Sequence, residues 1–397
     1  MAARRLEVNA VKRLLALAMM ALTLVAPPQI SAAEFGDEVA QGNFQAVIED
    51  LNNNSFKSFH AAIDKKALLG RVIGAYLIEP DIRDQLDESF DEWVEELFIA
   101  SFPPSDTEIV GTVVTFESFG DSARALVRYE SSGYRFAFHI YELTVASNGN
   151  IGIVDWTDYY NGGLFSEEAA ASFVRTLPTQ QATQQLLDNQ NLDEGRLFQV
   201  SELFKAVRDN SHGRFFSIYD AMDEELKAER VVVGLNLHMT QTWNDTARRG
   251  RAVEAVAANF PGDPLFSQAL IEFFIATSQF ERSITELETL QKGLGVVDGA
   301  TESLKATAAM ALGEMQRAEE YALSATQVEP DLELGWWSLL RVRTAAGDYV
   351  GATEAMTQLE DRFQYLLIPQ KLRRDRFLKV LIDQEEYKDW RAGRDEA

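Results

Sequence analysis

A short turn motif recurs at near-constant spacing through the C-terminal half of the chain. The stretch "TAAGDYVGATEAM" is typical of a corner between two helices, with Gly347 at the end of the first. Gly313 and Ser278 occupy equivalent places at steps of 34 and 35 residues. Asn244 and Asn210 continue the series at steps of 34. Because Gly and Asn tolerate the positive φ that a helix C-terminus often needs, the recurrence predicts a series of helical hairpins.

The side chains around these turns fit a stacked arrangement. Small residues stand where two helices must approach closely, at Ala318, Ala325 and Ala352. Large residues follow two positions after each turn, where they can close the corner, at Phe280, Met315 and Tyr349. A single hairpin is too small to bury its own apolar face, so neighbouring hairpins must stack into a solenoid.

The pattern resembles the tetratricopeptide repeat family, whose unit is a helical hairpin of ~34 residues. The match is best over residues 263–365. The consensus positions there are filled by Leu270, Phe280 and Leu287 in the first repeat, by Gly313, Ala318, Ala325 and Pro330 in the second, and by Trp336, Leu339, Gly347, Tyr349 and Ala352 in the third. Residues 164–262 keep the period but little of the consensus, which predicts a helical linker and degenerate repeats.

The resemblance also implies a binding surface. In this family the first helix of each hairpin lines a concave groove that holds a peptide or protein partner. The positions of this sequence that match groove positions are Gln268, Glu272, Ser303, Thr307, Trp337 and Arg341. Trp337 and Arg341 lie four apart on one helix face, and Trp and Arg are enriched among residues that dominate binding energy.

The N-terminal part has a different pattern. Residues 37–100 read as helices, and "DIRDQLDESFDEWVEELF" carries one apolar stripe: Ile82, Leu86, Phe90, Val94 and Leu97. The period then changes to two, which predicts strands at 107–119, 121–129, 134–145 and 151–160. Turn signals between them favour an antiparallel meander. We expect Tyr134, Phe136, Phe138 and Ile140 to pack on the helical stripe, and Arg135, His139 and Tyr141 to share the opposite face.

The predicted fold class is an α+β domain followed by an all-α solenoid. "NGG" at 161–163 ends the meander, which places the domains at 34–163, 164–262 and 263–365, with capping helices at 366–397. The order of helices and sheet resembles nuclear transport factor 2-like proteins, a fold that serves both enzymes and binding modules. Basic residues at 371–376 accompany apolar residues at helical spacing, so we interpret this segment as a polar solenoid cap rather than a basic binding patch.

Residues 1–33 have the pattern of a secretory signal peptide. Four basic residues precede the apolar run "LLALAMMALTLVA", which is followed by Pro27 and Pro28 and by "SAA" before Glu34. The alternative is a membrane anchor, but the run is short of the ~20 residues that a span needs. We therefore expect cleavage after Ala33, a periplasmic or secreted protein, and no stable membrane insertion after cleavage.

Charge and cysteine content exclude several functions. The formal net charge is −25, and loss of the leader, which has four basic residues and one acidic residue, would make it −28. Such a surface repels phosphate backbones and anionic membranes, so no nucleic-acid partner is expected. The chain has no cysteine, so disulfides, thiolate metal sites and cysteine nucleophiles are impossible.

No motif in the sequence indicates a metal, a cofactor or a catalytic nucleophile. The best catalytic constellation is His139 with Tyr141 and Asp155, because a carboxylate beside an imidazole can make a general base in a dry pocket. The alternative is that His139 is an ordinary strand residue. The sequence thus favours a non-enzymatic interaction scaffold for a protein or peptide partner in the cell envelope. A small-molecule binder or a hydrolase- or isomerase-type enzyme in the N-terminal domain is the second possibility.

Overall fold

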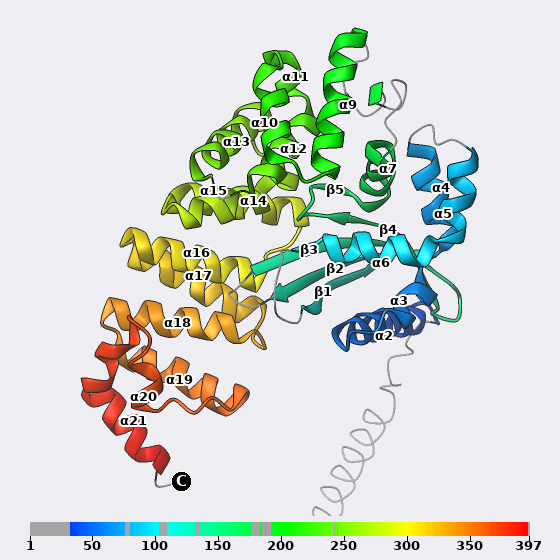
Figure 1. Ribbon diagram of the computed structural model, residues 1–397. Coiled ribbons are helices and arrows are strands. Elements are labelled where there is room, and N and C mark those ends of the chain that lie inside the picture. The colour runs from blue at the N-terminus through cyan, green and yellow to red at the C-terminus, as the bar shows by residue number, and fades with distance from the viewer. Residues whose placement is uncertain are drawn as a thin grey trace, which may run out of the picture.

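The computed structural model describes residues 32–75, 80–102, 109–131, 135–176, 183–184, 187, 192–241, 243 and 245–395. The predicted leader and Asn244 lie outside these residues, except that Ala32 and Ala33 begin the first helix. The described chain forms an N-terminal α+β layer and a C-terminal run of helical hairpins, as predicted (Figure 1). The N-terminal helices are α2 (Ala32–Asn52), α3 (Lys57–Ala62), α4 (Lys65–Ala75), α5 (Pro80–Glu88) and α6 (Phe90–Ala100).

The predicted apolar stripe of residues 82–97 is divided between two helices. α5 ends at Glu88, and α6 begins after Ser89, whose φ of −101° and ψ of 23° leave the helical region. Leu86, Phe90 and Val94 are nevertheless buried in one core. The helical period of the stripe is therefore confirmed at these three positions, and the stripe spans two helices.

The predicted meander is confirmed and gains a short fifth strand. The sheet has the order β1-β2-β3-β4-β5, with antiparallel neighbours throughout. The period-two segments thus pair in chain order. The strands are β1 (Val110–Ser118), β2 (Ser122–Ser131), β3 (Arg135–Val145), β4 (Ile151–Asp158) and β5 (Gly163–Leu164).

The two faces of the sheet are the reverse of the prediction. Phe136, Phe138 and Ile140 do not meet the N-terminal helices; they pack against solenoid residues that include Leu287 and Leu294. The opposite face forms the N-terminal core, and the side chains of that core include Tyr141, Leu143, Phe44, Phe59 and Phe98. The side chains of Tyr134 and Arg135 lie outside the described residues. Helix α7 (Phe165–Thr176) also contributes to the N-terminal core, and the domain boundary at 161–163 stays a prediction.

The solenoid consists of helices that follow one another from the top of Figure 1 down its left side. The first part, in the region predicted as degenerate, contains α9 (Glu194–Arg208), α10 (His212–Ala221), α11 (Glu224–Ala228), α12 (Arg230–Gln241) and α13 (Thr246–Asn259). The three regular hairpins are α14 (Pro264–Ala276) with α15 (Phe280–Leu294), α16 (Gly299–Leu312) with α17 (Met315–Val328), and α18 (Glu333–Ala346) with α19 (Tyr349–Phe363).

The recurring turns have the geometry that their residue types predicted. φ is 46° at Asn210, 59° at Ser278, 82° at Gly313 and 80° at Gly347. At each corner the amide of the next residue donates to a carbonyl five residues back, as from Glu314 to the Ala309 oxygen at 3.0 Å. This pattern satisfies carbonyls that a helix C-terminus leaves without partners.

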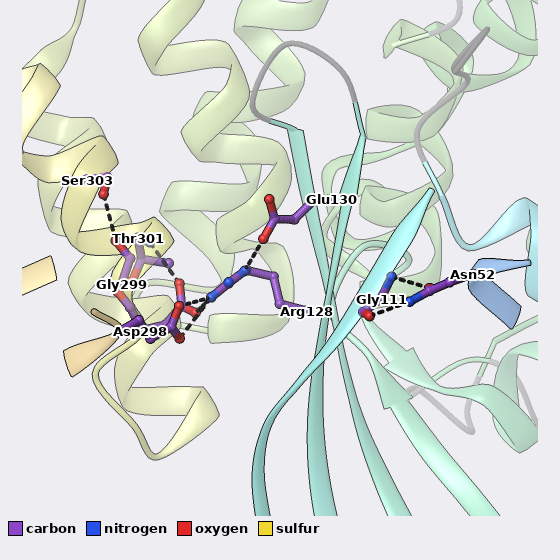
Figure 2. Close-up of polar contacts among 9 residues, drawn as sticks. Asn52, Gly111, Arg128, Glu130, Asp298, Gly299, Thr301 and Ser303 are labelled. Atoms are coloured by element: carbon purple, nitrogen blue, oxygen red, sulfur yellow. Dashed lines mark hydrogen bonds and ion pairs between the residues drawn. The ribbon is translucent and has the colours of Figure 1, made fainter. Parts of the chain in front are cut away.

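The sheet docks on the edge of the solenoid where one hairpin connects to the next. Arg128 of β2 reaches across this interface, with its side chain 2% exposed. It donates to Asp298, the N-cap residue of α16, and to both carboxylate oxygens of Glu329, the C-cap residue of α17, at 2.8 and 3.0 Å. Its Nε donates to Glu130 at 2.8 Å (Figure 2). On the opposite side of the sheet, Asn52 exchanges two hydrogen bonds with Gly111 and so fixes α2 on the edge strand.

The last segment packs on the final hairpin as expected of a cap. It contains α20 (Pro369–Leu372), the 3₁₀ helix η1 (Leu378–Asp383) and α21 (Glu385–Asp395). Leu372, Leu378 and Leu381 are buried in the same core as the α18 and α19 side chains. The apolar residues of the segment thus close the solenoid.

Candidate functional site

His139 lies inside the N-terminal core rather than at a pocket. Its side chain is fully buried, and its Nδ1 is 3.3 Å from the hydroxyl of Tyr141. The Tyr141 hydroxyl in turn lies 2.7 Å from that of Tyr129. The rings of Phe102 and Trp156 stack near the imidazole, with centroids 5.3 and 6.4 Å away. Burial lowers the pKa of His139 to about 3, so the imidazole is neutral near pH 7.

Asp155 does not join His139, and the predicted constellation is therefore not assembled. In the sheet, His139 is opposite Asp158, whereas Asp155 is opposite Glu142. The Asp155 carboxylate accepts from the hydroxyl of Ser166 at 2.6 Å and lies 3.2 Å from an Arg71 nitrogen. The strand register, which one sequence cannot give, is the reason for this difference.

Asp158 is the carboxylate nearest to His139, with 3.7 Å between Oδ1 and Nε2. Burial raises the pKa of Asp158 to about 6, although backbone amides of Asn161 and Tyr160 donate to it and oppose the shift. Aromatic rings fill the core around the imidazole. A neutral histidine packed in this way is a core residue, and the geometry gives no support to a general base that reaches a substrate.

The residues matched to groove positions fall into two groups. Gln268 and Ser303 are buried, with exposed fractions of 7% and 1%. Gln268 Nε2 donates to the Phe136 carbonyl of β3 at 2.6 Å. The Ser303 hydroxyl donates to the Gly299 carbonyl at 2.8 Å, as Figure 2 shows. Neither side chain is free on an open groove, because each is held by a neighbouring backbone carbonyl.

The other four residues are accessible. Glu272 is half-buried and lies 3.5 Å from Arg249, whereas Thr307 is exposed. Trp337 is half-buried and meets the ring of Tyr365 edge-on at 5.2 Å. Arg341 forms an ion pair with Asp375 at 2.8 Å. The face of the first helices is thus open only in part, and the C-terminal cap occupies one end of it.

A large cleft, which we call the interlayer cleft, separates the N-terminal layer from the first half of the solenoid. Its volume is about 1450 Å³, and it lies between α6, β5 and α7 on one side and α12, α13 and α14 on the other. Gln268 and Glu272 line it. Its apolar lining includes Ile99, Phe102, Phe136, Phe266, Ile271 and Ile275. Ile99 and Ile275 are 55% and 38% exposed, which is unusual for large apolar side chains on facing walls.

Both acidic and basic side chains line the interlayer cleft. Glu167 and Glu168 come from α7, and burial, with the nearby negative charges of Asp155 and Glu168, raises the pKa of Glu167. Arg230 and Arg249 come from α12 and α13. Among the described residues, no acceptor lies within hydrogen-bonding distance of Arg230 Nη2 or Arg249 Nε, although both atoms are buried.

A smaller pocket of about 370 Å³ lies at the other end of the first-helix face. Thr307 and Met310 of α16 and Arg341 of α18 form one side of it. The other side consists of cap residues that come directly before η1: Arg374, Asp375, Arg376 and Phe377. Two of the residues matched to groove positions, Thr307 and Arg341, are therefore brought together here.

The described residues contain no group of three His, Asp or Glu side chains that could hold a metal ion. In the same part of the chain, no helix is long and apolar enough to cross a membrane. Sequence reasoning missed Arg128, Arg230 and Arg249, because a single arginine in a strand or in a degenerate repeat carries no spacing signal.

Comparisons with known proteins give little further information. No protein-family model matches the chain, and no curated protein matches it. One solved structure is similar, a chain of the Chs5-Chs6 exomer cargo adaptor complex bound to a portion of Chs3. The match has 12% identity and a TM-score of 0.25, and it covers 69% of this chain but only 44% of that one. A likeness of this extent carries no argument about function.

Proposed function

We propose that this protein is a non-enzymatic interaction module that holds a peptide segment of a protein partner in the interlayer cleft. The cleft itself supports the proposal. Small-molecule sites usually have volumes of ~300–1,000 Å³, and the interlayer cleft, at about 1450 Å³, exceeds that range. Exposed apolar side chains on facing walls favour an occupant that brings apolar side chains of its own.

The charged groups indicate which peptide fits. Arg230 pairs with Asp263, and Arg249 lies 3.5 Å from Glu272. Arg230 Nη2 and Arg249 Nε nevertheless have no acceptor among the described residues, and such donors cost free energy when buried. A carboxylate satisfies an arginine fork with two parallel hydrogen bonds. The proposed occupant is therefore a segment with large apolar side chains and a carboxylate that reaches the α12 and α13 side.

Peptide display with the purified full chain tests this proposal. Peptides selected on the wild type should bind at least about tenfold more weakly to Ile99→Glu and to Ile275→Glu, since each change puts a charge on an apolar wall. Val350→Glu is the matched control, because Val350 is 61% exposed on α19 and does not line the cleft. The proposal would be overturned if the selection gave no binding peptide, or if Val350→Glu weakened binding as much as Ile99→Glu and Ile275→Glu do.

We also propose a repeat family for the solenoid and export for the protein. The solenoid hairpins are proposed to be divergent tetratricopeptide repeats, supported by their period and by the positive φ at the corners. Export is proposed from the N-terminal pattern of residues 1–33. Sequencing the N-terminus of the protein from an envelope fraction should start at Glu34, and an intact Met1 there would contradict export with cleavage.

A further inference from the structure

The C-terminal cap carries a group of basic side chains that its structural role does not use. Lys371, Arg373, Arg374, Arg376 and Lys379, together called the cap cluster, are all exposed. Within the part of the chain that the structure describes, none of these side chains forms an ion pair or a hydrogen bond. Arg376 only stacks on the ring of Phe377, with its guanidinium carbon 4.4 Å from the centroid.

Several other arginines of the solenoid form ion pairs between repeats. Arginines on the second helices reach carboxylates of a neighbouring repeat, as Arg282 reaches Glu254 at 2.6 Å. Arg317 reaches Glu281 at 3.1 Å in the same way. A chain with a net charge of −25 has ample carboxylates to neutralise the cap cluster. Elsewhere among the described residues, exposed cations without an ion pair also occur singly, as at Lys66 and Arg124, but here five of them fall within residues 371–379.

The cap cluster adjoins the smaller pocket. Arg374 and Arg376 line that pocket together with Arg341. Thr307 also lines it, and its hydroxyl donates to the Ser303 carbonyl at 3.0 Å. The single acidic residue of the segment, Asp375, is already engaged by Arg341 at 2.8 Å, so it does not neutralise its neighbours. The pocket is thus a recess with positive charge on one rim and an aromatic ring, Phe377, in its wall.

We infer that the cap cluster and the smaller pocket form a second binding site, which takes an acidic segment of a protein partner. Carboxylate side chains would pair with Arg374 and Arg376 at the rim, and one side chain of the segment would enter the pocket. A flat anionic membrane fits less well, because the surrounding acidic surface would be brought against it and repelled.

Fluorescence anisotropy with the full chain tests this inference. The probe is a fluorescein-labelled peptide of eight glutamates, and a peptide of eight glutamines is the uncharged control. The glutamate peptide should bind, and its affinity should fall with added salt because the pairs are exposed. The variant Arg374→Glu with Arg376→Glu should weaken binding at least about tenfold.

A second double variant separates a site from general attraction. Lys57→Glu with Lys66→Glu changes the net charge equally, and both lysines are exposed on the N-terminal helices. It should change the affinity less than about twofold. Equal losses in both double variants, no binding by the wild type, or preferential binding of phosphatidylglycerol vesicles would overturn the inference. The outcome is independent of the interlayer cleft, because the Ile99→Glu and Ile275→Glu variants leave the cap cluster intact.

Discussion

Replacing Arg128 by methionine should strongly destabilise the protein, because it leaves carboxylates without their cation in the interface between the two layers. The Asp298 side chain is fully buried and that of Glu329 is 18% exposed, so water cannot take the place of the guanidinium. Burial and the charge of Asp298 already raise the pKa of Glu329, and Arg128 opposes that shift. Removing one partner of a buried ion pair typically costs about 3–5 kcal/mol, and we expect a loss in this range.

The size of the loss can be assigned to the uncompensated charge by a double-mutant cycle. Asp298→Asn removes the negative charge and keeps a side-chain oxygen that can accept from the Thr301 amide at the start of α16. Arg128→Met combined with Asp298→Asn should therefore be less unstable than the sum of the single variants, with a coupling free energy of about 1–3 kcal/mol.

Urea unfolding followed by tryptophan fluorescence measures these free energies. Arg124→Met is the matched control, because Arg124 is exposed on the same strand. The control should change stability by less than about 0.5 kcal/mol. A loss below about 1 kcal/mol for Arg128→Met, or additive effects in the cycle, would refute a dry, charge-paired interface between the sheet and the solenoid.

The remaining predictions concern the turns, the helix contacts and the buried titratable pair. Gly347→Val should cost about 1–2 kcal/mol in urea unfolding through the positive φ alone, since a Cβ there would meet no atom within 4 Å. Ala352→Leu should cost about 1–3 kcal/mol by overpacking a fully buried position, and an unchanged midpoint would contradict close helix packing. Burial lowers the pKa of His139 to about 3 in the folded protein. The unfolded imidazole therefore binds a proton more readily, and lowering the pH from 7 to 5 should reduce the free energy of unfolding by roughly 2 kcal/mol. The pKa of Asp158 is raised to about 6, so the folded carboxyl binds a proton more readily than the unfolded one. The same drop in pH should therefore increase the free energy of unfolding by roughly 1 kcal/mol through this group. Relative to the wild type, His139→Gln should therefore gain stability from pH 7 to pH 5 and Asp158→Asn should lose it, and parallel pH profiles would contradict both shifts.

Local signals in the sequence were sufficient to predict the four long strands and the corners of the regular hairpins. The corners at Gly313 and Gly347 are determined by which residues tolerate positive φ, a property of the residue itself. The strands follow from alternation over eight to eleven residues in the longer members of the sheet. Both kinds of signal are short-range, so one sequence contains them in full.

The orientation of the sheet could not be predicted in the same way. Along β3, Phe138 and Ile140 alternate with Ala137, Tyr141 and Leu143, so both faces of the strand are apolar. Alternation distinguishes a buried face from a solvated one, but it cannot distinguish two buried faces. The choice depends on packing against residues more than a hundred positions away.

The same limit explains why the candidate sites were found only in part. Gln268 and Glu272 were selected as groove residues, and they do line the interlayer cleft, but its opposite wall comes from α6 and α7. Arg128 was not selected from the sequence, because its carboxylate partners in the solenoid lie 170 and 201 positions away. Residues whose partners are this distant give no periodic signal.

The interface at Arg128 also determines the geometry of the cleft. Arg128 is held by the N-cap residue of α16 and the C-cap residue of α17, and Gln268 of α14 is held by β3. The sheet therefore ties two consecutive hairpins to one rigid frame. Because one wall of the interlayer cleft belongs to the N-terminal layer and the other to the solenoid, the contacts that hold the layers together also set the width of the cleft. An occupant that fits this width gains from a site that is already formed, since little conformational freedom remains to be lost on binding.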